Sequence, residues 1–428
     1  MDNHQLSVKS YPLYKDSAIA WLGDVPEHWE VYQFKNIAFY QEGPGLRNWQ
    51  FTDEGIKVIS VTNITPPTIN FEKLKKYISV DEYQQIYKHF TVQKGDLLLA
   101  SSGASWGKLS TFNLNEKVIL NTSTIRIHSV KESYILTDFI RWILQSGYIY
   151  GSLITSLTGS CQPNFGPTHL NRLYVTFPPL AEQKLIAAYL DTKTAQCDRK
   201  IDLLTQKVTQ YGKLKQSLIN ETVTRGLDKS MLMKNSGIEW IRDVPEHWKV
   251  KRVKEVFTIS RGRVIAQTEL IENGHYPVYS SQTKDDGCLG YINTFDYEGD
   301  YITWTTDGVN AGTIFLRQGR FNCTNICGTL KLNEKNHFIG YLFYALQVSA
   351  KHNKRIDTNG AKIMSNEMMF IKISIPPLSE QKAIADYLDT KTAQIDQIIQ
   401  TINTQIEKLK ELRKTLINDV VTGKIKVV

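Results

Sequence analysis

Two short polar loops contain the residues of this chain whose types and spacing could do chemistry. Residues 101–108 read SSGASWGK, and residues 305–313 read TTDGVNAGT. Hydroxyl groups, an amide and the unobstructed N–H groups beside glycine suit phosphate oxygens, and Lys108 adds a positive charge. The loops therefore favour binding of a polyanion, although ordinary surface turns have the same composition.

No stretch of the chain predicts a catalytic centre. The segment GASWGK has three residues between its glycines where a nucleotide P-loop needs four, and Leu109 replaces the required Ser or Thr. A dinucleotide-binding glycine fingerprint, an HExxH motif and the (Asn/Asp)-Pro-Pro-(Tyr/Phe) tetrapeptide of adenine methylases are all missing. Cys323 and Cys327 lack the second pair of ligands that a zinc site needs, so no metal site is expected.

Further polar residues in the expected loops could read DNA. Arginine and lysine pair with guanine edges, and asparagine and glutamine pair with adenine. For any single residue, a solvated surface position is the simpler interpretation. Lys and Arg outnumber Asp and Glu by only 14 to 13 in residues 21–177 and by 17 to 14 in residues 240–375, so a DNA face must be a local patch. The candidate DNA contacts are Arg47, Ser101, Ser102, Ser105, Trp106, Lys108, Gln162, Asn164, Arg261, Arg263, Gln282, Lys284, Thr305, Thr306, Asn310 and Lys362.

Strands and amphipathic helices must position these loops. Residues 95–100 and 299–304 have the composition of strands that run directly into the two loops. One amphipathic helix is expected near the end of each module, at residues 136–157 and 338–352. Strands and helices mixed in this way predict two α+β modules.

A duplicated helix follows each module. Residues 178–201 and 376–399 are identical at 18 of 24 positions, which indicates a repeated structural element. A double proline precedes each copy, Ser379 is the expected N-cap of the second copy, and apolar spacing predicts helices over about 181–223 and 379–421. Apolar steps of three and four residues, with one local break in the heptad, favour a coiled-coil seam over a helix lying on its own module. The residues expected to pair are Ile201, Leu204, Val208, Leu214, Leu218, Ile399, Ile402, Ile406, Leu412 and Leu416.

A second repeat marks where each module begins. Residues 21–31, WLGDVPEHWEV, and residues 240–250, WIRDVPEHWKV, are identical at 8 of 11 positions. The motif indicates a turn anchored by tryptophan, in which His28 and His247 are structural rather than catalytic. A repeat of order two also predicts a pseudo-twofold axis. The expected segments are an N-terminal segment (1–20), a first module (21–177), a central helical spacer (178–227), a linker (228–239), a second module (240–375) and a C-terminal helical spacer (376–428).

The composition is that of a globular protein with a mild preference for anions. Of 428 residues, 41% are hydrophobic and 22% are charged, and the net charge is +8. The polar start contains no signal peptide, and no apolar run reaches the roughly 18 residues of a membrane span. Five cysteines without framework spacing indicate a reducing compartment, so a cytoplasmic location is expected.

The order turn, module, helix, turn, module, helix resembles the specificity (S) subunit of type I restriction-modification systems. The resemblance rests on the two VPEHW turns and the two PPLxEQKxIxxYLDxKTA helices, and it extends from about residue 17 to Ile425. It implies an α+β fold in which two target recognition domains are separated by two long antiparallel coiled-coil helices in a pseudo-twofold repeat. It also implies that each domain reads one half of a split, asymmetric DNA site.

The resemblance further implies which partners the chain has. The subunit would be non-catalytic, would bind double-stranded DNA, and would recruit two methyltransferase (M) subunits and motor-nuclease (R) subunits. It would bind no cofactor or metal, because S-adenosylmethionine, ATP and Mg²⁺ are used by those partners. A coiled-coil adaptor without sequence-specific DNA binding is the alternative, and a sequence-dependent DNA shift with the M partner would separate the two. A stand-alone DNA-modifying enzyme is disfavoured because no catalytic motif is present.

Overall fold

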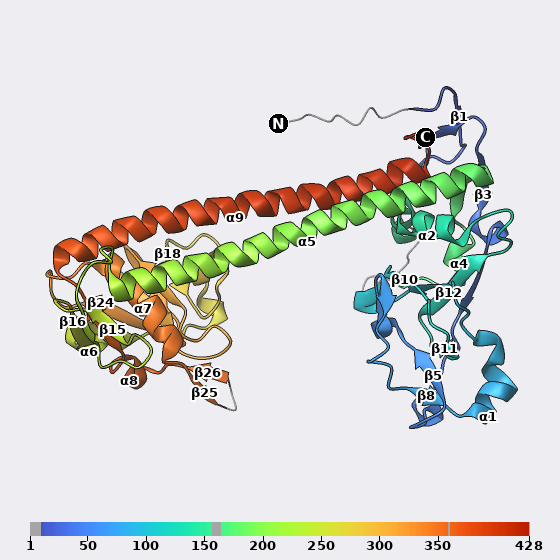
Figure 1. Cartoon of the computed structure of the whole chain (residues 1–428). Coiled ribbons are helices and arrows are strands. Elements are labelled where there is room, and N and C mark those ends of the chain that lie inside the picture. Colours follow the sequence, from blue (N-terminus) through green and yellow to red (C-terminus); the bar gives the residue numbers. More distant parts are fainter. Residues whose placement is uncertain (1–9, 156–163, 358–359, 428) are drawn as a thin grey trace. The chain divides into compact units, whose positions relative to one another are not determined.

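The computed structural model describes residues 10–155, 164–357 and 360–427 (Figure 1). The chain forms two compact units: unit 1 consists of residues 1–204 and 404–428, and unit 2 consists of residues 205–403. Each unit therefore combines one module with part of each long helix, α5 (Leu180–Arg225) and α9 (Leu378–Val421). The units cut across the expected helical spacers, so the proposed segment boundaries remain a prediction.

Both long helices extend as their apolar spacing predicts, but they begin slightly before the expected residue. The N–H of Gln183 donates to the carbonyl of Pro179, and the N–H of Gln381 donates to that of Pro377, at 3.0 Å in both cases. The carbonyl of the second proline thus opens each helix. Ser379 lies inside the first turn of α9, so its predicted role as N-cap was wrong.

The main sheet of unit 1 is antiparallel and has four strands. Their order is β10 (Leu109–Thr111), β9 (Leu97–Ala100), β12 (Thr124–Ser129) and β4 (Ala38–Glu42). The strand β9 is the apolar run Leu-Leu-Leu-Ala, and all four residues are buried, as its central position requires. A second sheet pairs β11 (Val118–Leu120) in parallel with β5 (Ile56–Ile59), which also pairs with β8 (Tyr77–Ile78).

The remaining elements of unit 1 form hairpins and short helices around these sheets. The strand β3 pairs with β13, β1 with β2, and β6 with β7, all antiparallel. Their bounds are β1 (Tyr14–Asp16), β2 (Asp24–Pro26), β3 (Glu30–Gln33), β6 (Ile64–Thr65), β7 (Thr68–Ile69), α1 (Val80–Glu82), α2 (Thr137–Gln145), α3 (Gly147–Thr155), α4 (Pro167–Leu170) and β13 (Tyr174–Phe177).

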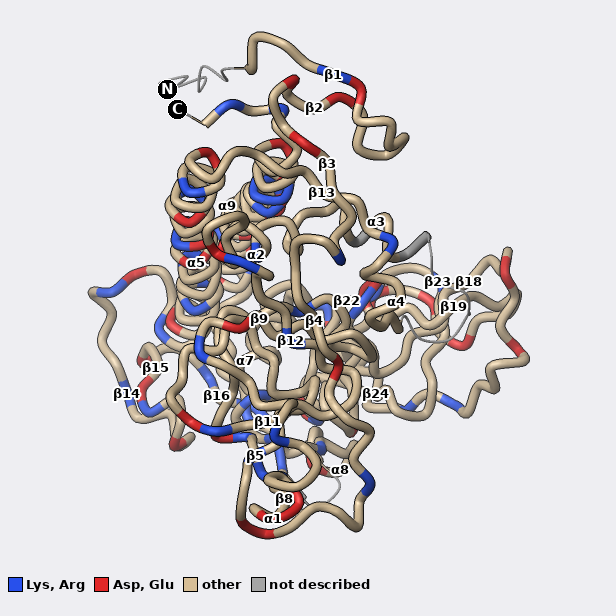
Figure 2. The backbone as a smooth tube through the Cα atoms, turned by 90° about the vertical axis from the view of Figure 1, so that its right-hand side faces the viewer, with Lys and Arg blue, Asp and Glu red and all other residues tan. Residues whose placement is uncertain are grey.

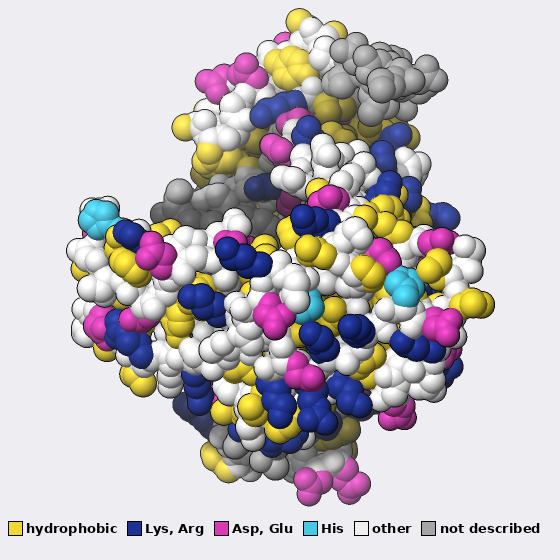
Figure 3. Space-filling view, turned by 90° about the vertical axis from the view of Figure 1, so that its left-hand side faces the viewer, with side chains coloured by type: hydrophobic (Ala, Val, Ile, Leu, Met, Phe, Trp, Pro, Cys, Tyr) yellow, Lys and Arg dark blue, Asp and Glu magenta, His cyan; other side chains and the backbone are white. Residues whose placement is uncertain are grey.

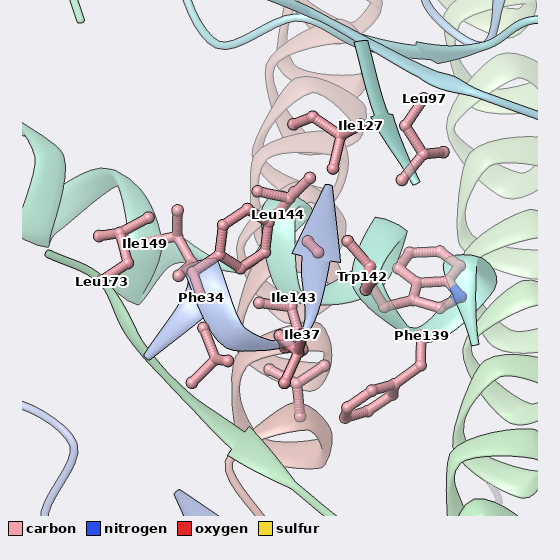
Figure 4. Packing of buried hydrophobic residues seen from close by; sticks show 14 of the residues in the cluster. Phe34, Ile37, Leu97, Ile127, Phe139, Trp142, Ile143, Leu144, Ile149 and Leu173 are labelled. Carbon is pink, nitrogen blue, oxygen red and sulfur yellow. The ribbon is translucent and has the colours of Figure 1, made fainter. Parts of the chain in front are cut away.

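The core of unit 1 packs α2 against the main sheet (Figure 4). Phe139 and Trp142 point from α2 into the same cluster as Leu97 of β9 and Ile127 of β12, and each is at most 2% exposed. The expected single helix over 136–157 is in fact two helices, because Ser146 is extended (φ −73°, ψ 146°). Its buried hydroxyl donates to the Ile143 carbonyl at 2.5 Å, so the side chain bonds the backbone at the break between α2 and α3.

Unit 2 repeats the topology of the main sheet of unit 1, and its second sheet has four strands where that of unit 1 has three. Its antiparallel sheet has the order β22 (Ile314–Arg317), β21 (Tyr301–Thr305), β24 (Cys327–Leu332) and β17 (Phe257–Arg261). A second sheet has the order β19 (Cys288–Ile292), β18 (Tyr276–Tyr279), β23 (Arg320–Cys323) and β20 (Tyr297–Glu298), with β18 and β23 parallel. The helix α7 (Ile339–His352) forms where the sequence predicts it. The other elements are β14 (Met233–Asn235), β15 (Asp243–Pro245), β16 (Lys249–Arg252), α6 (Val253–Val256), β25 (Arg355–Asp357), β26 (Gly360–Lys362), α8 (Ser365–Met368) and β27 (Lys372–Ile375).

Within unit 1, α5 and α9 run antiparallel and share a core. Ile186 of α5 lies in one buried cluster with Val420 of α9. Farther along α5, Asp198 Oδ1 lies 2.9 Å from Arg413 Nε, which precedes Val420 in α9. From Ile186 to Asp198 the residue numbers rise along α5, while those of the contacting residues fall along α9 from Val420 to Arg413, so the two helices are antiparallel.

Unit 2 has the same antiparallel arrangement. Val223 of α5 and Ile384 of α9 share a buried cluster, and Lys215 Nζ lies 2.7 Å from Asp396 Oδ1. Since 198 + 198 = 396 and 215 + 198 = 413, this ion pair is the repeat equivalent of Asp198 with Arg413. The α+β modules, the repeat and the antiparallel helices that the sequence predicts are thus present.

The buried stripe of each long helix differs from the expected one at a single residue. Leu214 and Leu412 are 53% and 54% exposed, so their predicted place in the seam was wrong. The stripe passes instead through the next residues, Lys215 and Arg413, which form the two ion pairs. The other expected seam residues are buried or half-buried: Ile201, Leu204, Val208, Leu218, Ile399, Ile402, Ile406 and Leu416.

Charged residues of both signs lie along the long helices α5 and α9 (Figure 2). Exposed apolar residues lie among them: Leu185, Leu203, Leu214, Ile398 and Leu412. Among the residues that the structure describes, no helix combines the length and apolar character needed to cross a bilayer.

Candidate nucleic-acid interface

The two polar loops have the same backbone frame. In unit 1, Gly107 N donates to Ala100 O at 2.8 Å, and in unit 2 Gly312 N donates to Thr305 O at 2.8 Å. A second backbone hydrogen bond also recurs: Lys108 N donates to Ser105 O, and Thr313 N donates to Asn310 O, both at 3.0 Å. The offset is 205 residues in both cases (312 − 107 and 313 − 108), so each residue of one loop has an equivalent in the other.

Glycine allows this frame to form twice. Gly103 and Gly107 have φ of 65° and 77°, and their equivalents Gly308 and Gly312 have φ of 87° and 79°. Residues with a Cβ rarely adopt this left-handed region. These four glycines therefore fix how the two loops turn.

Neighbouring segments hold each loop on both sides. Ser101 N donates to Ser123 O, and its equivalent Thr306 N donates to Ile326 O, at 2.9 Å each. On the other side, the Ser101 carbonyl accepts from Phe165 N at 3.1 Å, and the Thr306 carbonyl accepts from Ile363 N at 2.8 Å. Each loop is therefore a rigid projection from the end of a central strand, β9 or β21.

Three predicted contact residues position the loops instead of facing solvent. Ser101 and Thr306 are fully buried and Thr305 is 1% exposed. The Thr306 hydroxyl donates to the Ile326 carbonyl at 3.0 Å. Their side chains have no surface with which to touch a large ligand, so their assignment as DNA contacts is corrected to a supporting role.

The surface of the unit 1 loop is polar and carries one cation. Lys108 is exposed, and its Nζ lies 3.5 Å from the half-buried Ser105 hydroxyl. Exposed Asn164 is paired through a backbone bridge with Ser102. Trp106 packs edge-on against the buried Phe165 ring, with centroids 5.7 Å apart, and so supports the loop. Of the other two candidates in this unit, Arg47 is exposed on the segment after β4, where its N–H bonds Gln50, and Gln162 lies outside the described residues.

The unit 2 loop presents different side chains on the same frame. Val309 at its tip is 99% exposed. Asn310 Nδ2 donates to the Ser281 carbonyl at 2.9 Å, which joins the loop to the segment of Gln282 and Lys284. Asp307 pairs through a backbone bridge with Lys362, the equivalent of Ser102 with Asn164.

The remaining unit 2 candidates border the same loop. Exposed Arg261 donates through Nε to the Asn325 carbonyl at 2.5 Å, beside the Ile326 carbonyl that holds Thr306. Gln282 donates to the Cys288 carbonyl, and Lys284 is exposed in the adjoining turn. The structure therefore brings these residues, Asn310 and Lys362 to one patch, as the sequence alone could not show.

Arg263 is engaged by acids. Its Nη1 lies 3.0 Å from Glu269 Oε2 and its Nε lies 3.1 Å from Asp296 Oδ2. The hydrogen bond that Arg263 donates to Glu269 is the main cause that raises the pKa of Arg263, and the charge of Asp296 adds to it. Because two carboxylates already neutralise it, Arg263 is a weaker candidate for a phosphate contact than Arg261.

The sequence did not predict Asp307 and Val309 as contact residues; in the unit 2 loop Val309 is exposed and Asp307 is half-buried. A single apolar residue in a polar loop has no sequence signal that separates a reading residue from an ordinary one. The equivalent of Val309 in unit 1 is Ala104, since 309 − 205 = 104, and it is also exposed.

Charge elsewhere on the surface is mixed. On the face seen in Figure 3, Lys and Arg are interspersed with Asp and Glu, so no broad cationic surface covers that side. Among the described residues, no three His, Cys, Asp or Glu side chains gather as a metal site.

The chain has similarity to known proteins over most of its length. A family model described as "Type I restriction modification DNA specificity domain" matches residues 26–210 and 245–408. A type I specificity subunit of Mycoplasma pneumoniae is 32% identical over 243 residues, covering 56% of this chain and 90% of that protein. The type I restriction enzyme MjaVIII specificity subunit of Methanocaldococcus jannaschii is 25% identical over 439 residues, 94% of each chain.

Two solved structures share the fold at low sequence identity. A chain from a study of complex assembly and conformational transition of the type I R-M system is 15% identical, covers 93% of this chain and 98% of its own, and has a TM-score of 0.72. The HsdS subunit of Thermoanaerobacter tengcongensis is 16% identical, with a TM-score of 0.53 over 94% of this chain and 98% of its own.

Proposed function

Because the chain belongs to the type I restriction-modification specificity-subunit family, we propose that it reads a bipartite, asymmetric DNA site, one half with each module. Specificity subunits are the DNA-recognition components of these systems and are distinct from the methyltransferase and nuclease subunits. The chain is accordingly a recognition subunit and not an enzyme.

One observation supports this proposal above the others: the same loop frame occurs twice and presents different side chains. An identical frame offers equivalent places for two stretches of duplex. Different side chains at those places read different bases, because specificity depends on the groups offered to base edges. A protein that recognises one base sequence twice would instead present the same groups in both units.

The exposed and half-buried side chains at the loops suit distinct parts of the duplex; Lys108, Asn164 and Val309 are exposed, and Asp307 and Lys362 are half-buried. In unit 1, Lys108 suits a phosphate, and Asn164 suits an adenine edge. In unit 2, Lys362 suits a guanine edge, Asp307 suits the cytosine amino group, and Val309 suits the thymine methyl group. Asymmetry of the site follows because these sets differ.

The long helices supply the second part of the proposed function. They set the distance between the two half-sites and offer docking surfaces for two M subunits, to which R subunits add. In this assembly S-adenosylmethionine serves the M subunits, and ATP and Mg²⁺ serve the R subunits. The chain itself holds none of them and works without a membrane, in the cytoplasm.

The test is a module exchange. Residues 21–177 are replaced by the first module of another family member, and the methylated adenines are mapped by sequencing in a host that carries the complete system. One half of the methylated site should change to that of the donor, while the other half and the spacing should stay the same. The reciprocal exchange of residues 240–375 is the matched control, and it should change only the other half.

A change in both halves after a single exchange would contradict the assignment of one half-site to each module. No sequence-dependent DNA shift by the chain with its M partner would favour the adaptor alternative.

A further inference from the structure

A carboxylate at the start of each long helix binds the repeated turn in the same way. Glu182 Oε1 lies 2.6 Å from His28 Nε2, and Glu182 Oε2 accepts from Trp29 Nε1 at 3.0 Å. In unit 2, Glu380 makes the equivalent bonds to His247 and Trp248 at the same distances, 2.6 and 3.0 Å. The Glu182 and Glu380 clusters can therefore be compared residue by residue, and a difference between them marks what is particular to one unit.

Unit 1 has a third donor that fills the space beside the carboxylate. The Tyr11 hydroxyl donates to Glu182 Oε2 at 2.8 Å, and the Tyr11 ring is 5% exposed. The ring packs edge-on against Trp29 at 5.5 Å between centroids. A phenol is thus a group that this carboxylate and its apolar surroundings can hold.

Unit 2 has no aromatic residue at this position. The hairpin register fixes the equivalence, because Tyr14 pairs with Pro26 in unit 1 and Met233 pairs with Pro245 in unit 2, an offset of 219 in both strands. Residue 11 + 219 is Ser230, whose hydroxyl turns to Asp228 at 2.7 Å. Among the described residues, Trp248 is the single hydrogen-bond donor to Glu380 Oε2.

A pocket lies beside Glu380, on the side where unit 1 holds the aromatic ring. Its lining includes Asp228, whose repeat equivalent in unit 1 (228 + 198 = 426) is Lys426, and Lys426 Nζ lies 5.8 Å from the centre of the Tyr11 ring. This Glu380 pocket has a volume of about 210 Å³ and is lined by Leu227, Asp228, Met231, Glu380, Ala383 and Ile384. A cavity of about 150 Å³ is enough to bind benzene. The Glu380 side chain is 40% exposed where that of Glu182 is 25% exposed, as the missing ring requires.

We propose that the Glu380 pocket binds a tyrosine side chain of an M subunit, whose ring enters between Ile384 and Leu227 and whose hydroxyl donates to Glu380. We choose a phenol because the Tyr11 hydroxyl donates to the equivalent carboxylate, Glu182, in unit 1. The choice of the M subunit rests on the proposed function, in which the helix starting at Leu378 is a docking surface. In unit 1 the place equivalent to the Glu380 pocket is occupied by Tyr11 of the chain itself, so only the M subunit bound to unit 2 makes this contact.

The first experiment tests the pocket without any partner. Binding of p-cresol to the full chain is followed by saturation-transfer NMR in the wild type and in two variants. Ser230→Tyr provides the chain with its own ring, and Ala383→Trp fills the pocket from its lining with a side chain larger than Leu185, which stands at the equivalent position in unit 1. We expect p-cresol to bind the wild type and to bind neither variant. Leu232→Tyr adds a tyrosine at a 75% exposed position of the same hairpin and should leave the binding unchanged. Equal p-cresol binding by all four proteins would overturn the pocket.

The second experiment tests the partner by titrating purified M subunit into the same four proteins. The wild type and Leu232→Tyr should bind two M subunits with their normal affinities. Ser230→Tyr and Ala383→Trp should weaken one of the two binding events roughly ten- to hundredfold, the value of one hydrogen bond to a charged group.

The outcomes separate this inference from the proposed function. If p-cresol binding is lost in Ser230→Tyr but M binding is unchanged, the M subunit is not the occupant. If sedimentation shows that the wild type is a dimer and Ser230→Tyr is a monomer, a second copy of this chain occupies the pocket, and the assignment of the pocket to the M subunit is overturned. If the wild type binds no M subunit, both the proposed docking of M subunits and the tyrosine of the M subunit as the ligand are excluded. The p-cresol experiment still tests whether the pocket binds a phenol.

Discussion

At the scale of single residues, the carboxylates at the starts of the long helices tie each module to its helix. Glu182 and Glu380 each join a histidine and a tryptophan from the VPEHW turn, and both tryptophans are fully buried. A buried indole N–H needs an acceptor, and an anion at the first turn of a helix also faces the positive end of the helix dipole. The two histidines therefore have the structural role that the sequence predicts.

Replacing Glu182 with glutamine should destabilise unit 1. Trp29 and Tyr11 both donate to Oε2 of Glu182, while His28 bonds Oε1. A glutamine can keep its single amide oxygen beside Trp29 and Tyr11 only by turning its NH2 group toward His28, and the two bonds that remain lose the charge of the carboxylate. The expected loss is about 1–3 kcal/mol in the free energy of unfolding, measured by urea denaturation. Glu380→Gln is the matched control and should cost less, because Tyr11 has no equivalent there; an equal or larger loss in unit 2 would contradict this view of the cluster.

The same carboxylate should make stability depend on acid pH. Burial opposes the charge on Glu182, but hydrogen bonds from Tyr11, His28 and Trp29 outweigh it and hold its pKa below the ordinary value. A carboxyl whose pKa is lower in the folded state stabilises above its unfolded pKa of about 4.3, and this stabilisation is lost as the pH falls through both values. The difference in unfolding free energy between wild type and Glu182→Gln should shrink between about pH 6 and pH 3, and a constant difference would exclude a charge effect.

Lys108 should contribute to DNA binding without regard to sequence. Its exposed ammonium group on the unit 1 loop suits a phosphate, so Lys108→Ala should weaken binding about equally for matched and mismatched sites. It should also lower the slope of log affinity against log salt by about 1, as measured by fluorescence anisotropy of the assembled complex. Lys94→Ala is the control, since Lys94 is an exposed lysine before β9, at the opposite end of that strand from the loop. A change confined to one base position would assign Lys108 to base reading instead.

At the scale of elements, the strands and long helices could be predicted because their apolar patterns are strong. The run Leu97–Ala100 and the three-and-four spacing of α9 leave few alternatives. The break at Ser146 was missed because serine is tolerated inside helices and nothing in the apolar pattern changes there. Leu214 was misplaced because the local break in the heptad moves the seam by one residue, which spacing alone does not resolve.

The candidate site could be predicted only as a pair of loops. Glycine and hydroxyl composition found both loops, but it could not separate the buried Thr306 from the half-buried Asn310. Exposure there depends on hydrogen bonds to segments distant in the chain, such as the one containing Ile326. The patch around the unit 2 loop is likewise made by contacts that no sequence pattern records.

Lengthening both helices should lengthen the unread gap of the DNA site. One heptad inserted after Leu204 and another after Asn403 falls at the boundaries between the two units and leaves each unit whole. Seven helical residues add about 10 Å, roughly three base pairs of duplex. Methylation mapping should show both half-sites unchanged and a spacer about three base pairs longer. Insertion of the heptad into α5 alone should disturb the pairing and reduce activity; retention of the original spacing by the double insertion would exclude the helices as the ruler.

At the scale of the whole molecule, the repeat makes parts of the two helices interchangeable. In unit 1 the Thr176 hydroxyl donates to the carbonyl of Val421, and in unit 2 the Ser374 hydroxyl donates to that of Val223. The ion pairs repeat in the same way, since Asp198 with Arg413 matches Asp396 with Lys215. Residues 205–225 thus already pack onto one module in the way that residues 404–421 pack onto the other.

A chain that ends at Asn235 should therefore form a homodimer. Truncation removes residues 404–428 from unit 1 and exposes the apolar stripe of α5, but a second copy can supply Val223 in place of Val421 and Lys215 in place of Arg413. Two such copies paired antiparallel form a closed, self-complementary dimer. It should be weaker than the native pairing, because Cys197 and Tyr211 stand where the repeat has Ile395 and Leu409.

The DNA site of that dimer should differ from the native one in a defined way. Two identical readers related by a twofold axis recognise an inverted repeat, so methylation with the M partner should move to an inverted repeat of the unit 1 half-site. Sedimentation gives the mass, and sequencing of methylated adenines gives the site. Lys215→Glu in the truncated chain should weaken the dimer by opposing Asp198, and Asp198→Lys in the same chain should restore it, which assigns the interface to this pair. A stable monomer, or methylation that stays at the asymmetric site, would show that the two halves of the repeat cannot replace each other.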